Sequence, residues 1–267
     1  MDMHLSIRHL TKYRYTNELK SGVQQLRLTP IKSKFQKIRN WSVELRGGCE
    51  TLSYKDQFGN QTRFVEINDG ASEIEVAIQG EIDVIDNAGM LGAEKEIVPM
   101  WVYAIETPMT QAGKKLRSFM NMKFPDGVVE SLHFLSFKIK EALKYADGVS
   151  EVGWSVEDVL TAKAGVCQDF AHVFIAAARQ LGHPARYVSG YLKMDTEQQT
   201  AMHAWSEVFI EKVGWVGFDA ANGICPDEKY VRVAVGRDYY DAAPFRGISY
   251  GADIREELDV QIHISQQ

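Results

Sequence analysis

Cysteine is scarce in this sequence of 267 residues, which contains only Cys49, Cys167 and Cys225. Three widely spaced cysteines cannot form a disulfide framework, and an odd number leaves at least one thiol unpaired. No stretch approaches the roughly 18 apolar residues that a membrane-spanning helix needs. The first residues include Asp2 and Arg8, where a secretory signal would have an apolar run. These absences predict a soluble cytoplasmic protein with reduced thiols and no membrane association.

Excess positive charge is absent as well. The chain has 30 Lys and Arg against 36 Asp and Glu, a formal net charge of −6. Proteins that bind nucleic acid need a basic face to neutralise phosphates, so nucleic acid is not an expected partner. Hydrophobic residues make up 45% of the chain, which excludes a disordered protein and allows a sizeable core.

The two halves of the sequence differ in periodicity. Up to about residue 86, short runs alternate polar and apolar residues between turn signals, which predicts an antiparallel β-sandwich. Residues 87–100 lose the alternation and read as a linker. Beyond them, helical periods come first and strand-like runs follow, which predicts an α+β arrangement. We therefore expect a β-rich N-terminal domain over residues 1–95 and an α+β core over residues 96–267.

Cys167 opens one of the predicted helices. Apolar residues recur on two faces of this helix, so it is expected to be buried, and Gly182 followed by Pro184 ends it. A thiolate is the nucleophilic form of cysteine, and the free N–H groups at a helix N-terminus favour its negative charge. The same N–H groups can contribute to an oxyanion hole. Cys167 is therefore the candidate nucleophile.

A nucleophilic cysteine needs a base, and the base needs a group that orients it. His203 begins the strand-like run HAWSEVFI, and Asp219 ends the next run, GWVGFD. The turn around Lys212–Gly214 predicts that these runs pair as a hairpin. The first residue of one strand would then lie beside the last residue of the other. We expect His203 and Asp219 to be neighbours, and we hypothesise that the Cys167 helix docks at that end.

Three separated blocks, GVCQDFAHVFIAAARQLGHPARYVSGY, HAWSEVFIEKVGWVGFDAANG and VRVAVGRDYYDAAPFRG, resemble those of the bacterial transglutaminase-like superfamily. HLTKYRYTNEL and DQFGNQTRFVEI resemble the β-rich region that precedes this core in many bacterial members. The resemblance implies a papain-like core with Cys167 as nucleophile, His203 as general base and acid, and Asp219 as the orienting group. One departure is Ala220-Ala221 after the aspartate, where the family commonly has Pro and Thr.

Other residues near these motifs have competing interpretations. Gln168 and Trp205 are candidate substrate-binding residues, although Trp205 could equally be a packing residue. Cys49 and Cys225 are expected to be packing residues. Cys167, His172, His203 and Cys225 are ligand types for zinc, but no spacing typical of a zinc site occurs. No acidic loop with calcium-ligand spacing is present either, so we expect no metal and no cofactor.

The leading hypothesis is acyl transfer through a thioester on Cys167, with a peptide or protein amide as substrate. Water as the second nucleophile would make the protein a peptidase or amidase, and an amine would make it a transglutaminase. The resemblance favours hydrolysis, because bacterial members of this kind are commonly regarded as cysteine proteases. The alternative from another class is a non-catalytic binding scaffold with a transglutaminase-like fold.

Overall fold

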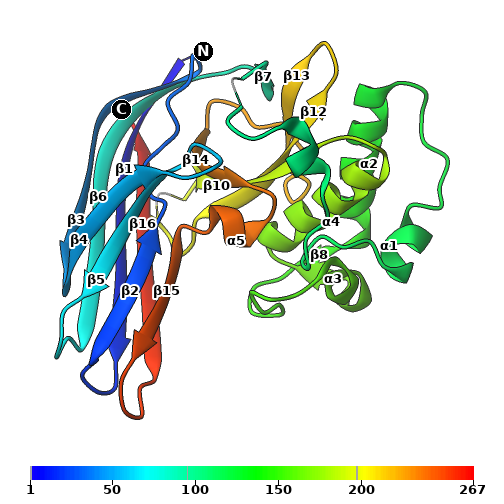
Figure 1. Cartoon of the computed structure of the whole chain (residues 1–267). Helices are drawn as coiled ribbons and strands as arrows, with labels where there is room; N and C mark the ends of the chain where they lie inside the picture. Colours follow the sequence, from blue (N-terminus) through cyan, green and yellow to red (C-terminus); the bar gives the residue numbers. More distant parts are fainter. Residues whose placement is uncertain (1, 95, 197) are drawn as a thin grey trace.

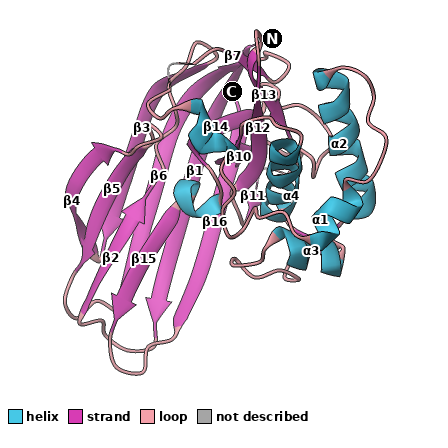
Figure 2. Ribbon diagram, turned by 45° about the vertical axis from the view of Figure 1, so that its right-hand side comes forward, coloured by secondary structure: helices cyan, strands magenta, loops and turns pink. Residues whose placement is uncertain are grey.

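The computed structural model describes residues 2–94, 96–196 and 198–267. It has three layers: a β-sandwich, a central core sheet and a group of helices on the far side of that sheet (Figure 1). The predicted α+β class is confirmed. A second view shows the core-sheet strands between the sandwich and the helices (Figure 2).

Two antiparallel sheets form the sandwich. The alternation of buried and exposed residues in the N-terminal half places one side of each strand against the other sheet. Val65 of one sheet and Val76 of the other, for example, are completely buried in one cluster between the two sheets. In spatial order, sheet A comprises β11 (Gln198–Gln199), β16 (Glu256–Gln266), β1 (Asp2–Tyr15), β6 (Glu73–Ile85) and β3 (Gln36–Arg46), and sheet B comprises β15 (Phe245–Tyr250), β2 (Ser21–Leu26), β5 (Gln61–Ile67) and β4 (Gly48–Lys55).

Both ends of the chain contribute to the sandwich. β16 pairs with β1 along its length, and β15 pairs with β2. The expected division assigned residues 96–267 to the core, whereas the structure returns residues 245–267 to the sandwich. The reason is that period-two alternation predicts a strand but does not say which sheet it joins. Ile262 and Ile264 of β16 are buried with Leu5 and Ile7.

The core sheet has the order β14 (Tyr230–Gly236), β10 (Ala185–Leu192), β12 (His203–Ile210), β13 (Gly214–Phe218) and β7 (Met90–Gly92). Strand β7 comes from the segment interpreted as a linker. One face of this sheet carries the helices, and Tyr191 and Val231 on the other side pack with the apolar residues of sheet A.

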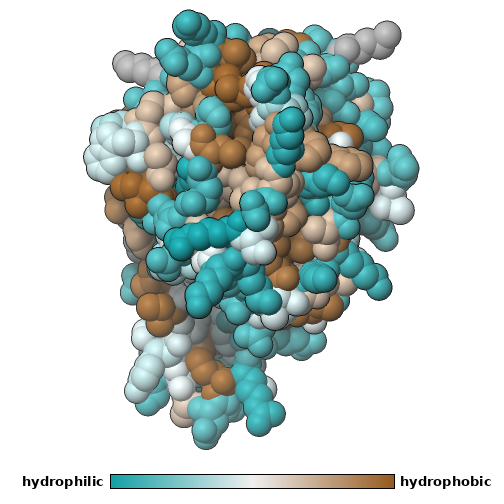
Figure 3. All heavy atoms as spheres, turned by 90° about the vertical axis from the view of Figure 1, so that its right-hand side faces the viewer, coloured by the Kyte–Doolittle hydropathy of each residue, from teal (hydrophilic) through white to brown (hydrophobic). Residues whose placement is uncertain are grey.

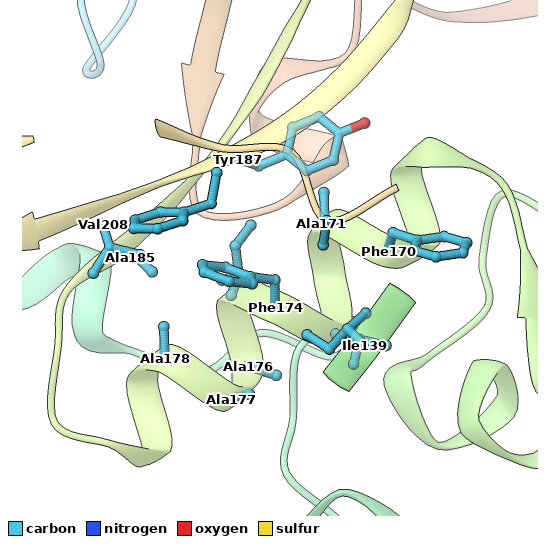
Figure 4. Packing of buried hydrophobic residues seen from close by; sticks show 14 of the residues in the cluster. Ile139, Phe170, Ala171, Phe174, Ala176, Ala177, Ala178, Ala185, Tyr187 and Val208 are labelled. Carbon is cyan, nitrogen blue, oxygen red and sulfur yellow. The ribbon is translucent and has the colours of Figure 1, made fainter. Parts of the chain in front are cut away.

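The helical layer surrounds α4 (Cys167–Gln180), whose bounds agree with the predicted helix. Phe174 of α4 stacks on Phe218 of β13 with ring centroids 5.1 Å apart. Ala171, Ala177 and Ala178 let neighbouring elements approach closely (Figure 4). Around α4 lie α1 (Lys114–Phe119), α2 (Val128–Ala142), α3 (Val156–Ala162), α5 (Tyr239–Ala242), the 3₁₀ turn η1 (Met100–Ala104) and the short strands β8 (Lys144–Tyr145) and β9 (Ala164–Gly165).

The outward surface of the helical layer is mostly hydrophilic, with hydrophobic residues scattered across it (Figure 3). Phe137 of α2 is among the exposed hydrophobic side chains. In the described part of the chain, no helix is both long and apolar enough to span a membrane.

Candidate active site

Cys167 is the first residue of α4 and is partly exposed. The two-residue strand β9 leads directly into it and pairs in parallel with β8, with Tyr145 opposite Gly165. The first N–H groups of a helix have no partner within the helix, so those beside Cys167 are available to a negative charge. The thiol is thereby placed at the positive end of a buried helix and within reach of solvent.

Asp169 fixes the chain where it enters this helix. One oxygen of its buried carboxylate accepts hydrogen bonds from the backbone N–H of Val166 at 2.8 Å and from the hydroxyl of Ser150 at 2.6 Å. Gly165 is required at this point, because a Cβ there would collide with the Asp169 carboxylate. Burial raises the pKa of Asp169 above its usual value. The carboxylate ties both the nucleophile turn and the loop around Ser150 to the start of α4.

The predicted hairpin brings His203 and Asp219 together. β12 and β13 are antiparallel, with Ser206 opposite Phe218, so the first residue of β12 and the residue after β13 meet at one end. His203 Nε2 lies 2.6 Å from Asp219 Oδ2. The positive backbone angles of Lys212 and Gly214, φ 70° and 95°, close the turn at the other end.

Asp219 is a buried acceptor, with only 1% of its surface exposed. Besides His203, its Oδ2 accepts from Asn222 Nδ2 at 2.7 Å and from the Tyr230 hydroxyl at 2.8 Å. Its Oδ1 accepts from the backbone N–H groups of Ala221 and Asn222, each at 3.1 Å. Burial alone would raise the pKa of this carboxyl, but the hydrogen bonds and the charge of His203 outweigh it and lower the pKa. Asp219 is therefore held as the anion.

His203 lies between Asp219 and the thiol. Burial lowers its pKa, but the hydrogen bonds to Asp219 and Cys167 and the charges of both groups overcome this effect and raise the pKa to about 10. The ring is consequently an imidazolium at neutral pH. Since Asp219 binds Nε2, Nδ1 is the nitrogen that remains for Cys167. The structure thus brings the three predicted residues together in the order cysteine, histidine, aspartate.

Trp205 supports the His203 ring from within the protein. It is 1% exposed, and its ring is stacked with that of His203 at 6.2 Å between centroids. Gly190 of β10, opposite His203, leaves room for it, since a Cβ at residue 190 would lie 2.7 Å from the Trp205 ring. In this position Trp205 sets the orientation of the histidine. Because almost none of its surface is exposed, Trp205 is not placed to contact a substrate, and the structure does not support a substrate-binding role for it.

The remaining residues considered from the sequence have different positions and roles. Gln168 donates from Nε2 to the carbonyl of Val152 at 3.2 Å and so joins α4 to the neighbouring loop. Cys49 is exposed on β4, so the expectation that it is a packing residue is wrong. Cys225 is partly buried against the main core cluster, and burial raises its pKa. His172 is buried and neutral, because burial and the charge of Arg179 lower its pKa to about 3.

Two tyrosines of the site were not foreseen. The Tyr145 hydroxyl is hydrogen-bonded to the side chain and to the backbone N–H of Cys167, and burial together with the thiolate charge raises its pKa to about 12. The Tyr230 hydroxyl donates to Asp219, and burial and that carboxylate raise its pKa well above the usual range. Both hydroxyls therefore keep their protons at neutral pH. A single aromatic residue in a strand is typical of packing, so the sequence offered no signal for either role.

Across residues 2–94, 96–196 and 198–267, no group of three or more His, Cys, Asp or Glu side chains could hold a metal ion. His203, one of the zinc-type ligands considered from the sequence, is instead hydrogen-bonded to Asp219.

Two segments of the chain match models of known protein families. Residues 123–220, which include all three site residues, match the model of the transglutaminase-like superfamily, and residues 5–83 match the bacterial transglutaminase-like N-terminal region. Residues 123–220 of the chain thus belong to the transglutaminase-like superfamily. The second match covers three strands of sheet A and three strands of sheet B. It therefore accounts for the β-rich first half of the chain.

Sequence similarity to other proteins extends over nearly the whole chain. The uncharacterized proteins Rv2569c of Mycobacterium tuberculosis and ML0607 of Mycobacterium leprae are each 27% identical over 97% of this chain, covering 91% and 97% of their own lengths. A crystal structure of a "putative cysteine protease" from Cytophaga hutchinsonii has the same fold, with a TM-score of 0.77 and 21% identity over 100% of this chain and 91% of that one. Family and fold support an enzyme of the cysteine-dependent kind.

Alkylation by iodoacetamide tests the ion pair between Cys167 and His203. At about pH 6.5, wild-type Cys167 should react faster than Cys49 or Cys225, because the imidazolium stabilises the thiolate that is the reactive form. The His203→Ala variant should lose this advantage, with Cys167 alkylation slowed about tenfold or more and Cys49 unchanged as internal control. Peptide mapping by mass spectrometry measures all three rates. Equal Cys167 rates in both proteins would show that no functional ion pair exists.

Proposed function

We propose that this protein transfers acyl groups through a thioester on Cys167 and uses water to cleave an amide or peptide bond. The observation that carries the proposal is the position of His203, which is hydrogen-bonded to both the Cys167 thiol and the buried Asp219 carboxylate. A nucleophile, a base and an orienting group in contact are the arrangement that covalent acyl transfer needs.

In the first step, the Cys167 thiolate attacks the carbonyl carbon of the amide and forms a C–S bond. The carbonyl electron pair moves onto oxygen and gives a tetrahedral oxyanion. The imidazolium of His203 then protonates the nitrogen, the C–N bond breaks, and the amine leaves. The products are a thioester on Cys167 and a neutral His203, still oriented by Asp219.

The oxyanion of this intermediate needs donors that are already in place. The backbone N–H of Cys167 points from the start of α4, and the Tyr145 hydroxyl is hydrogen-bonded to the same N–H and to the thiol. A carbonyl oxygen that replaces this contact would accept from both groups. We therefore assign the two oxyanion donors to the Cys167 N–H and the Tyr145 hydroxyl.

In the second step, neutral His203 removes a proton from the attacking nucleophile. With water, the new C–O bond forms, the C–S bond breaks, and a carboxylic acid and the thiolate result. With a primary amine, the product is a new amide, which is transglutaminase chemistry. The name of the Cytophaga hutchinsonii protein supports hydrolysis, and the retention of all three residues in contact argues against a non-catalytic scaffold.

The choice between water and amine is open to direct measurement. A fluorogenic peptide library should be cleaved by the wild-type chain and not by the Cys167→Ala variant. Adding a primary amine such as dansylcadaverine should leave most of the product as free acid, as detected by mass spectrometry. Predominant dansyl-amide formation would replace the peptidase proposal with a transglutaminase, and an active Cys167→Ala variant would refute both.

The Tyr145→Phe variant tests the oxyanion donor. It keeps the ring and removes only the hydroxyl, so kcat should fall by about 10²-fold with KM little changed, the size of effect expected for one lost donor. The Tyr230→Phe variant, which loses a donor to Asp219 outside the oxyanion position, serves as the matched control and should fall less. Equal losses, or an unchanged Tyr145→Phe enzyme, would remove Tyr145 from this role.

A further inference from the structure

A groove of about 680 Å³ crosses the outer face of sheet A, away from Cys167, His203 and Asp219. It lies over all five strands. The register of the sheet aligns one row of side chains across them, in the order Ser42, Gln79, Arg8, His263 and Gln198. A second row, two residues along each strand, consists of Glu44, Ala77, Leu10 and Gln261.

The dimensions of the groove suit an extended chain. Five strands about 4.8 Å apart make the first row about 19 Å long, which accommodates about six residues at the rise of an extended segment. The small side chain of Ala77 lies in the middle of the second row and leaves the floor low there. The volume is within the range of ordinary ligand sites.

The chemistry of the lining favours a polypeptide over other polymers. The amides of Gln79, Gln198 and Gln261 each offer a donor and an acceptor, which matches the N–H and C=O groups of a peptide backbone. No Phe, Tyr or Trp ring lines the described groove, whereas sugar rings usually need such a ring to stack on. Its basic groups are few for a nucleic acid, and the chain has a net charge of −6.

Two charges in the groove are available to a ligand. Among the residues that the structure describes, neither Arg8 nor Glu44 takes part in an ion pair. They lie in different rows, with Arg8 on the central strand β1 and Glu44 on the edge strand β3. An extended peptide with acidic and basic side chains could satisfy both, in addition to its backbone bonds to the amides.

A short segment of the chain connects the groove to the catalytic hairpin. Its end wall is β11, which pairs with β16 (Figure 2) and belongs to the segment between β10 and β12. Thr200, another lining residue, is three positions before His203. Gln199 anchors this segment, since its Nε2 donates to the carbonyl of Leu192 at 2.8 Å. The same short segment therefore borders the groove and leads into the catalytic histidine.

We infer that the sheet A groove is an exosite that binds an extended segment of the polypeptide substrate, remote from the bond that reacts. The inference rests on the proposed function for the identity of the ligand. It assigns to the N-terminal sandwich the recognition of substrate through main-chain hydrogen bonds, which makes binding tolerant of sequence.

Binding to the full-length Cys167→Ala protein tests the exosite without turnover. The probe is fluorescein-labelled β-casein, a disordered polypeptide, titrated by fluorescence anisotropy. The double variant Ser42→Trp/Ala77→Trp, in the same Cys167→Ala background, fills the groove and should weaken binding about tenfold or more, the equivalent of about 1.4 kcal/mol. The matched control is Ser53→Trp, an exposed strand serine on sheet B, which should bind casein normally.

Circular dichroism verifies that each variant is folded. If the double variant does not fold, Arg8→Ala, which fills no space, should still weaken casein binding measurably. Unlabelled dextran should not displace casein, and displacement would assign the groove to a glycan instead. Absence of casein binding, or binding that the groove variants leave unchanged, would overturn the exosite.

Activity assays separate this inference from the proposed function. In the background with Cys167 intact, the groove variants should reduce kcat/KM for casein while turnover of a short fluorogenic peptide stays unchanged. A wild-type protein that binds casein through the groove but turns over neither substrate would refute the peptidase proposal alone. Equal turnover of casein by wild type and groove variants would refute the exosite alone.

Discussion

The burial of helix α4 is the constraint on which the rest of the core depends. Nearly every residue from Asp169 to Arg179 is removed from solvent, so the helix needs neighbours on all sides. The core sheet covers one side through Phe218 and Val208, and α2 and α3 cover others. The sheet is supported in turn by sheet A of the sandwich. The helix reaches the surface at its ends, where Gln180 is exposed and Cys167 is partly exposed. Cys167 stands at the N-terminal end.

This arrangement joins a rigid helix to a rigid hairpin. Asp219 is immobilised by five hydrogen bonds, so it can hold the His203 ring without rearrangement. Trp205 supports the same ring from the protein interior. Preorganised groups of this kind stabilise developing charge without reorganising during the reaction. The electrostatic result is an imidazolium beside a cysteine at a helix N-terminus.

Much of the site followed from local sequence patterns. The apolar faces after Cys167 predicted the helix and its start, and two strand-like runs around a turn predicted that His203 and Asp219 meet. These features depend on contacts close in sequence. Tyr145 could not be predicted, because it reaches Cys167 only through the two-residue pairing of β8 with β9. Tyr230 likewise reaches Asp219 from a different strand, β14.

The same distinction holds for the fold: patterns within short stretches of sequence were predictive, whereas pairings between distant stretches were not. The class and the β-rich first half were predictable from periodicity. The return of β15 and β16 to the sandwich was not, since the alternation of Ile262 and Ile264 fits any half-buried sheet. The short helix α3, held by a capping box between Ser155 and Asp158, also lacked a long enough period to be recognised.

The central claim is that Cys167 forms the covalent acyl intermediate with the help of His203. The most direct measurement is intact and tandem mass spectrometry after brief exposure to p-nitrophenyl acetate and acid quench. The account predicts one acetyl group on Cys167 of the wild-type chain and a much slower appearance of it in the His203→Ala variant. Acetylation confined to Cys49 or Cys225, or Cys167 acetylation at the same rate in both proteins, would contradict it.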